Sequence, residues 1–144
     1  KTFTHIAQLG LLLMVMNATA GTVDLGQYQW KNRLLFVFSP SVGDPNYQNI
    51  TKAVVQRQEG MRERDLLFFQ VLATGEVYRG HVLLPDSEAS LLRERFAIKS
   101  DQFAVLLIGK DGGVKLMKES VVDLSDIFSL IDSMPMRQQE MREK

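Results

Sequence analysis

Three short runs of apolar residues constrain the fold of this chain most strongly. They are LLFVF at 34–38, LLFFQVL at 66–72 and FAVLLI at 103–108. Runs of this kind, without regularly spaced polar positions, are typical of strands that a sheet buries on both faces. Stretches with helical periodicity separate them. This alternation predicts a layered sheet with crossover helices.

The segments between the runs carry the signals of helices. Over 46–59 the apolar residues fall on one helical face, and Gly60 is expected to end that helix. A second helix is expected to begin after Pro85, where acidic and hydroxyl side chains can cap it. Its apolar residues would face the core, and Arg93 is expected to be exposed.

A glycine-rich turn follows the third apolar run. GKDGG at 109–113 leads into a strand at 114–117, which is the pattern of a β-hairpin. A last helix is expected after Asp123, which can cap it, and Pro135 is expected to end or kink it. The order strand, helix, strand, helix, hairpin, helix predicts an α/β fold of the thioredoxin-like class, a four-stranded mixed sheet covered by helices. One domain over 25–142 accommodates all of it.

The first twenty residues are expected to be an export signal. Lys1 precedes an apolar run at 6–16, and Ala18-Thr19-Ala20 has the small-residue pattern of a cleavage site. The run is roughly half of the ~20 apolar residues that a membrane-spanning helix needs. We therefore expect a signal peptide at 1–20, no transmembrane anchor after its cleavage, and an exported protein in the periplasm or the extracellular space.

Composition excludes several classes of function. The chain has no cysteine, so it has no thiolate for disulfide exchange or peroxide reduction. Its 17 basic and 17 acidic residues balance, which leaves no long-range field to attract nucleic acid. Beyond the expected leader, His81 is the only histidine, so neither a Ser-His-Asp triad nor a zinc site is indicated. No metal or cofactor is expected.

Several segments resemble a thioredoxin-like domain of unassigned function. They are QWKNRLLFVFSPSVGDPNYQ at 29–48, RERDLLFFQV at 62–71, LLRERF at 91–96, FAVLLIGKDGGVKL at 103–116 and IDSMPMRQQEMR at 131–142. The specific part is GKDGG followed by IDxMPMRQ. That domain occurs alone in exported bacterial proteins and repeated in vertebrate sushi-repeat and coiled-coil-domain-containing matrix proteins. The resemblance implies a fold close to that of peroxiredoxins and an association with a matrix or a cell surface.

The segment after the first apolar run is a candidate ligand site. FVFSP at 36–40 is similar to the peroxiredoxin segment that precedes the helix with the reactive cysteine. Free N–H groups at this helix start, with the hydroxyls of Ser39, Ser41 and Tyr47, can hold an anion or a small molecule. Asp44 works against an anion, because its carboxylate can cap the same groups. We favour a self-capped turn; a binding site, or an enzyme site without a thiol, stays open as the alternative.

The C-terminal segment is a candidate partner-binding surface. MPMRQQEMREK contains Met134, Met136 and Met141, and methionine side chains adapt to irregular partners. Arg95 and Arg137 are placed to pair with acids such as Asp65 or Asp132. We favour the simpler interpretation, in which the methionines dock the segment onto its own sheet. The function expected overall is that of a non-enzymatic exported domain that binds a protein or an envelope or matrix component.

Overall fold

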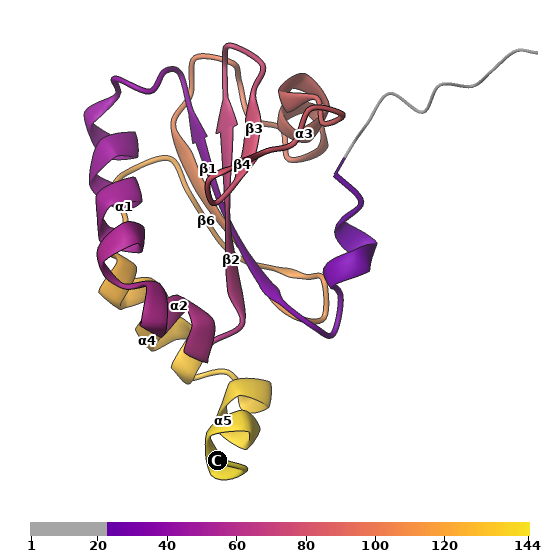
Figure 1. Ribbon diagram of the computed structural model, residues 1–144, viewed down its shortest axis with the longest axis vertical. Helices are drawn as coiled ribbons and strands as arrows, with labels where there is room; N and C mark the ends of the chain where they lie inside the picture. Colours follow the sequence, from indigo (N-terminus) through magenta and orange to yellow (C-terminus); the bar gives the residue numbers. More distant parts are fainter. Residues whose placement is uncertain (1–22) are drawn as a thin grey trace, which may run out of the picture.

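A computed structural model describes residues 23–144 as one sheet with helices on both faces (Figure 1). The expected signal peptide at 1–20 lies outside the described residues. The sheet has the strand order β4-β3-β2-β1-β5-β6. Its strands are β1 (Arg33–Ser39), β2 (Leu66–Leu72), β3 (Val77–Arg79), β4 (Val82–Leu83), β5 (Ala104–Ile108) and β6 (Val114–Lys118). β1 and β2 are parallel, and the other neighbouring pairs are antiparallel.

The expected sheet of four strands was wrong, because six strands form in the described part of the chain. The two additional strands are β3 and β4, which pair along the outer edge of β2. They have three and two residues and no apolar run, so periodicity does not reveal them. Gly80, between them, has a φ of 61°, a left-handed conformation that suits glycine in a tight turn.

Helices cover the sheet unequally. They are the 3-10 helix η1 (Leu25–Tyr28), α1 (Pro45–Gln56), α2 (Gln58–Glu63), α3 (Ala89–Arg95), α4 (Leu124–Asp132) and α5 (Pro135–Arg142). Figure 1 shows α1, α2 and α4 on one face and α3 with the N-terminal segment on the other. None of the helices in the described residues has the length and apolar character needed to cross a membrane.

The central strand divides two apolar cores. All seven residues of β1 are buried. Leu35 and Val37 pack in the core beneath α1 and α4, whereas Leu34, Phe36 and Phe38 pack in the core beneath α3. Side chains alternate between the faces of a strand, so a strand buried on both faces is apolar throughout. This confirms the position predicted for the first apolar run.

Two local expectations about the helices were wrong. Gly60 lies inside α2 and does not end a helix; a Cβ there would lie 2.6 Å from Cε2 of Phe128, so the glycine allows α4 to approach. Arg93 is buried and not exposed. The expectation for Pro135 was right in part: α4 ends at Asp132, and the proline then begins α5, where it has no N–H to lose.

Candidate functional site

The turn between β1 and α1 is closed by its own aspartate. Oδ1 of Asp44 accepts hydrogen bonds from the backbone N–H groups of Asn46, at 2.9 Å, and Tyr47, at 3.0 Å. Pro45 occupies the first helical position, where its fixed φ suits the helix. The N–H groups that would hold an anion are therefore already used.

The hydroxyl groups expected at this turn do not converge. Ser39 is buried, and its Oγ donates to the backbone oxygen of Ser41 at 2.7 Å. The phenol of Tyr47 is also buried and donates to Oε1 of Gln70 at 2.5 Å. Burial raises the pKa of the Tyr47 phenol. Among the four candidate residues, only Ser41 has an exposed side chain that is free of these internal contacts.

A buried arginine completes this end of the sheet. Nη2 of Arg93 donates to the backbone oxygens of Ser39, at 3.0 Å, and Val71, at 3.5 Å; Nη1 donates to those of Lys99, at 2.5 Å, and Gln102, at 3.3 Å. Burial lowers the pKa of Arg93, which is only 5% exposed. The side chain thus ties the ends of β1 and β2 to the loop before β5. Sequence reasoning missed it, since a charged residue on a short helix gives no sign of burial.

The opposite end of the sheet is held by ion pairs. Glu140, on α5, forms two hydrogen bonds with the guanidinium of Arg33, both at 3.1 Å, and one with Nζ of Lys110 at 2.6 Å. Lys110 belongs to the GKDGG turn, and Arg33, only 1% exposed, is the first residue of β1. One carboxylate therefore joins α5, the turn and the central strand.

A second carboxylate supports the same region. Asp132 accepts from Arg64, at 3.0 and 2.7 Å, and from Nε of Arg137 at 3.0 Å. The pairing suggested for Arg137 is thus present. Burial by itself would raise the pKa of Asp132 and of Glu140, but the hydrogen bonds from their cationic partners outweigh it and hold both pKa values below the usual range.

The methionines of the C-terminal segment take different positions. Met134 packs against the core beneath α1 and α4, as the docking interpretation expects. Met136 and Met141 stay on the surface, each 39% exposed. Met134 and Met136 also line a pocket of about 360 Å³, together with Pro135 and residues of the GKDGG turn. Ion pairs hold α5 in place and leave two of its methionines free.

Trp30 borders the same turn and was missed by sequence reasoning. Its backbone N–H donates to the oxygen of Lys110 at 2.6 Å. The side chain is 64% exposed, and φ is 67°, a left-handed conformation that is rare for a bulky residue. The sequence shows only that Trp30 is the one tryptophan of the chain. A positive φ before a strand leaves no mark in the pattern of apolar residues.

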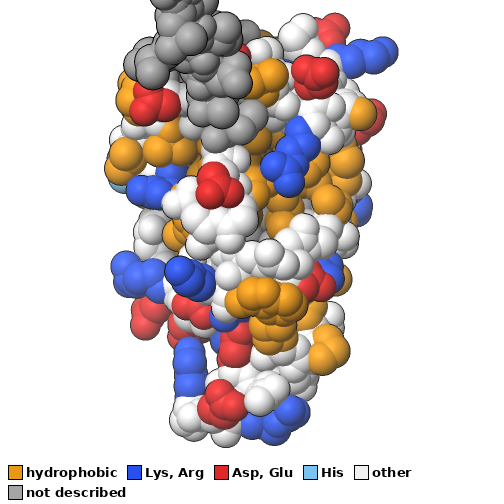
Figure 2. Space-filling view, turned by 90° about the vertical axis from the view of Figure 1, so that its right-hand side faces the viewer, with side chains coloured by type: hydrophobic (Ala, Val, Ile, Leu, Met, Phe, Trp, Pro, Cys, Tyr) orange, Lys and Arg blue, Asp and Glu red, His pale blue; other side chains and the backbone are white. Residues whose placement is uncertain are grey.

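The surface carries mixed charge around α5. Figure 2 shows Lys and Arg side chains interspersed with Asp and Glu side chains over the lower part of the molecule, with hydrophobic side chains gathered in patches above. Such mixing gives no field of one sign on this face of the molecule.

Comparison with known sequences finds one matching family model and similar segments in vertebrate proteins. A family model described as a domain of unknown function, DUF4174, matches residues 24–140. Coiled-coil domain-containing protein 80 of Danio rerio is 29% identical over 133 residues, which cover 81% of this chain and 15% of that protein. Sushi repeat-containing protein SRPX of Homo sapiens is 28% identical over 120 residues, 81% of this chain and 26% of that protein. The chain spans about a quarter or less of these relatives.

Two solved structures with a similar fold are a peroxiredoxin and a thioredoxin peroxidase. The reduced 2-Cys peroxiredoxin of Plasmodium vivax has a TM-score of 0.58 and 13% identity, with 80% of this chain and 84% of that chain covered. Thioredoxin peroxidase I of Plasmodium yoelii has a TM-score of 0.56 and 16% identity, with 80% and 79% covered. At this identity the likeness shows the fold alone, a mixed α/β thioredoxin-like fold. The cysteine chemistry in those names has no counterpart in a chain without cysteine.

Proposed function

The chain belongs to the DUF4174 family, a domain of unknown function, and from that premise we propose that it is an exported, non-enzymatic domain that binds another protein. The missing cysteine removes the thiol chemistry of its structural neighbours. Export, to the periplasm or the extracellular space, rests on the leader-like residues 1–20. The names of the relatives, which include sushi repeats and a coiled coil, describe proteins assembled from several modules.

The proposed binding surface is the one around the GKDGG turn. We call it the turn surface; it comprises Trp30, the turn at 109–113, Met134, Pro135 and Met136. The observation that carries the proposal is the exposed Trp30 in its left-handed conformation. That conformation costs about 1–2 kcal/mol for an L-residue. Tryptophan is also one of the side chains enriched among the few residues that carry most of the binding energy in protein interfaces. Backbone strain of this kind is concentrated at functional sites. A partner that covers the indole would account for its exposure in the free chain.

The pocket beside the turn indicates what the partner presents. Its apolar part consists of Met134, Pro135 and Met136. The cations at its rim are already neutralised, since Lys110 pairs with Glu140 and Asp65, and Lys115 pairs with Asp111. We therefore expect the partner to fill the pocket with an apolar side chain. It does not need an acidic group to neutralise the lysines at the rim. Methionines can adjust their rotamers to such a side chain.

The test uses the single tryptophan as a reporter. Crosslinked capture from an envelope or secreted extract would supply a partner, which is then purified and titrated against the chain. We expect the emission of Trp30 to shift to the blue on binding, because the indole leaves water. Binding should weaken about 100-fold in a Trp30→Ala/Met136→Ala double variant. Val42→Ser, at an equally exposed valine on the other end of the sheet, is the matched control.

Three results would count against the proposal. One is a captured partner that binds the double variant as tightly as the parent chain. Another is binding without any change in Trp30 emission, which would place the interface elsewhere. The third is reproducible absence of a protein partner while an envelope polysaccharide or another matrix component is retained.

The alternative site at 39–47 has less support. Asp44 occupies the free N–H groups, and the hydroxyls of Ser39 and Tyr47 are used internally. A ligand there would have to displace contacts that already satisfy the buried polar groups. His81, on the loop between β3 and β4, makes no hydrogen bond to these residues in the part of the chain that the structure describes.

A further inference from the structure

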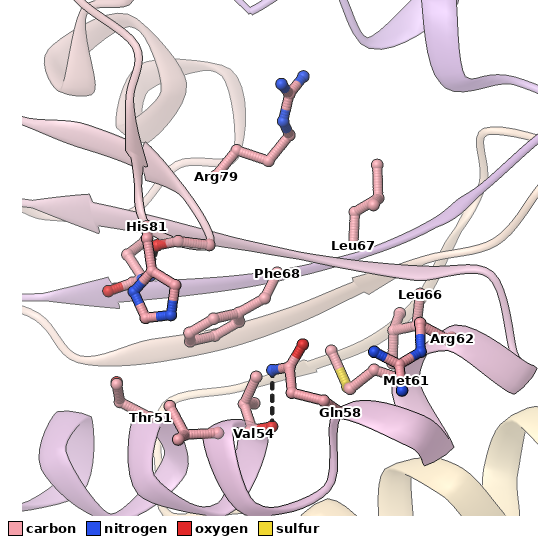
Figure 3. A pocket seen from close by; sticks show the side chains of 13 residues that line it. Thr51, Val54, Gln58, Met61, Arg62, Leu66, Leu67, Phe68, Arg79 and His81 are labelled. Carbon is pink, nitrogen blue, oxygen red and sulfur yellow. Dashed lines mark hydrogen bonds between the residues drawn. The ribbon is translucent and has the colours of Figure 1, made fainter.

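We propose that a second pocket, between α1, α2 and the outer part of β2, binds a small amphipathic carboxylate (Figure 3). The ligand class is a molecule of roughly ten non-hydrogen atoms in all, made up of an apolar body and one carboxylate. This pocket lies away from the turn surface and shares no residue with it. The inference is therefore independent of the proposed function.

The walls of this pocket are apolar and come from three elements. Val54 lies on α1, Met61 on α2, and Leu66 and Phe68 on β2; all four are buried. In Figure 3 the side chain of Phe68 points from the strand toward the helices, with Val54 and Met61 facing it. Arg79 extends to the other face of the sheet, where it donates to the hydroxyl of Tyr28 at 2.9 Å. The walls suit the apolar body of a ligand.

One buried polar atom in the lining lacks a partner. Oγ1 of Thr51 is shielded from solvent and makes no well-aligned hydrogen bond among the described residues, although it lies close enough to the Tyr47 phenol to offset part of the rise in the pKa of that phenol. The neighbouring amides are already used: Gln58 donates to the oxygen of Val54 at 2.8 Å, and Gln70 donates to that of Gly80 at 2.8 Å. An unpaired buried hydroxyl costs free energy unless a ligand or water satisfies it. In Figure 3 Thr51 lies at the opposite end of the lining from Arg62, so its hydroxyl is left to water and is not a partner of the carboxylate.

The charge of the lining is of one sign. The lining includes Arg62 at its mouth and no aspartate or glutamate. This is uneven for a chain with 17 acidic and 17 basic residues. Arg62 makes no ion pair within the described residues, although Glu59 and Glu63 flank it on α2. A guanidinium without a partner binds a carboxylate through two parallel hydrogen bonds.

The size of the pocket limits the ligand. Its volume of about 310 Å³ is at the lower end of the range for small-molecule sites. At about 30 Å³ per water-sized atom, it holds roughly ten non-hydrogen atoms. A nucleotide is too large for this space. A purely apolar molecule would leave Arg62 without a counter-charge.

The test compares an acid with its alcohol. The probes are 4-phenylbutyrate and 4-phenylbutan-1-ol, which share the apolar body and differ in the carboxylate. They are titrated against the chain with labelled methionine methyl groups, and the resonance of the buried Met61 reports occupancy by NMR. We expect a saturable shift of Met61 with the acid and about ten-fold weaker binding of the alcohol, the difference that one charge-assisted contact makes.

Variants test the assignment of Arg62. Arg62→Gln should lower the affinity for the acid to that for the alcohol, whereas Lys52→Gln, on an exposed position of α1 outside the lining, should leave it unchanged. Val55→Trp, at the exposed mouth, should block both probes. The proposal is overturned if Met61 shows no saturable shift, if acid and alcohol bind the parent chain equally, or if Arg62→Gln retains the preference for the acid. An unchanged melting temperature shows that each variant is folded.

Discussion

The two ends of the central sheet satisfy their polar groups in opposite ways. Where β1 and β2 end, Asp44 caps α1 and Arg93 bonds only to backbone oxygens, so the polar groups of the turn are used locally. Where β1 begins, charged side chains from distant segments pair around Glu140, and Trp30 remains exposed beside them. At the first end, the hydrogen bonds within the turn leave no polar group for a ligand, so we call it the closed end. At the other end, ion pairs hold one side of α5, and apolar residues of α5 remain exposed for a partner to contact.

The largest effect is expected from Arg93. Arg93→Met should lower the free energy of unfolding by about 3 kcal/mol, because the backbone oxygens of Ser39 and Lys99 lose a buried donor. Urea denaturation followed by circular dichroism measures it. Arg95→Met, at an exposed position on the same helix, should cost less than about 0.5 kcal/mol. Equal losses in both variants would show that the closed end does not depend on this arginine.

A somewhat smaller effect is expected from Glu140. Glu140→Gln should cost roughly 2 kcal/mol at pH 7, because it leaves the buried cation of Arg33 without a counter-charge. Glu143→Gln, exposed on the same segment, is the control. A cost below about 0.5 kcal/mol would mean that the ion pairs contribute little at this end.

The ion pairs at the end where β1 begins should also make the stability of the fold depend on pH. The pKa of Glu140 is lowered on folding, so its contribution is fully present above the unfolded pKa of about 4.3 and is lost as the pH falls through the folded pKa. The free energy of unfolding should thus decline below about pH 4. In Glu140→Gln the decline should be shallower, with Asp132 still contributing. Identical profiles for the variant and the parent chain would contradict this assignment.

The helix cap at the closed end should contribute less. Asp44→Ala removes the acceptor of two N–H groups and should cost about 1 kcal/mol. Glu88 occupies the same position before α3 but makes no capping hydrogen bond, so Glu88→Ala should cost much less. Thermal unfolding of the two variants side by side gives the difference, and a reversed order would refute the role of Asp44 as a cap.

The smallest change in stability is expected at Trp30. Trp30→Gly relieves the left-handed conformation, so stability should stay level or rise by about 0.5–1 kcal/mol. Binding of the partner should be lost at the same time. Trp30→Ala keeps the strained backbone, so it should lose binding of the partner without any gain in stability. If Trp30→Gly lowers stability by more than about 1 kcal/mol, the side chain has a structural role instead.

The strands and helices that are marked in the sequence by an apolar run or a capping residue were predicted. The short strands without such a mark were not. The apolar runs became β1, β2 and β5, and the caps expected at Asp44 and Asp123 are present. β3 and β4 were missed, because such short strands form only where β2 offers an edge to pair with. The contacts of the candidate residues were not foreseen: Tyr47 donates to Gln70, and Ser39 donates to the backbone oxygen of Ser41.

The amino-acid sequence by itself determined the layered α/β fold and the absence of thiol chemistry. Apolar periodicity follows from local geometry, and a missing cysteine needs no structure to be recognised. Tertiary structure alone decided that Arg93 is buried, that Met136 and Trp30 are exposed around one turn, and that Arg62 stands at the mouth of an acid-free pocket. These properties depend on which distant segments meet. The packing of the whole sheet decides which segments come into contact, and these contacts cannot be read from the order of the residues.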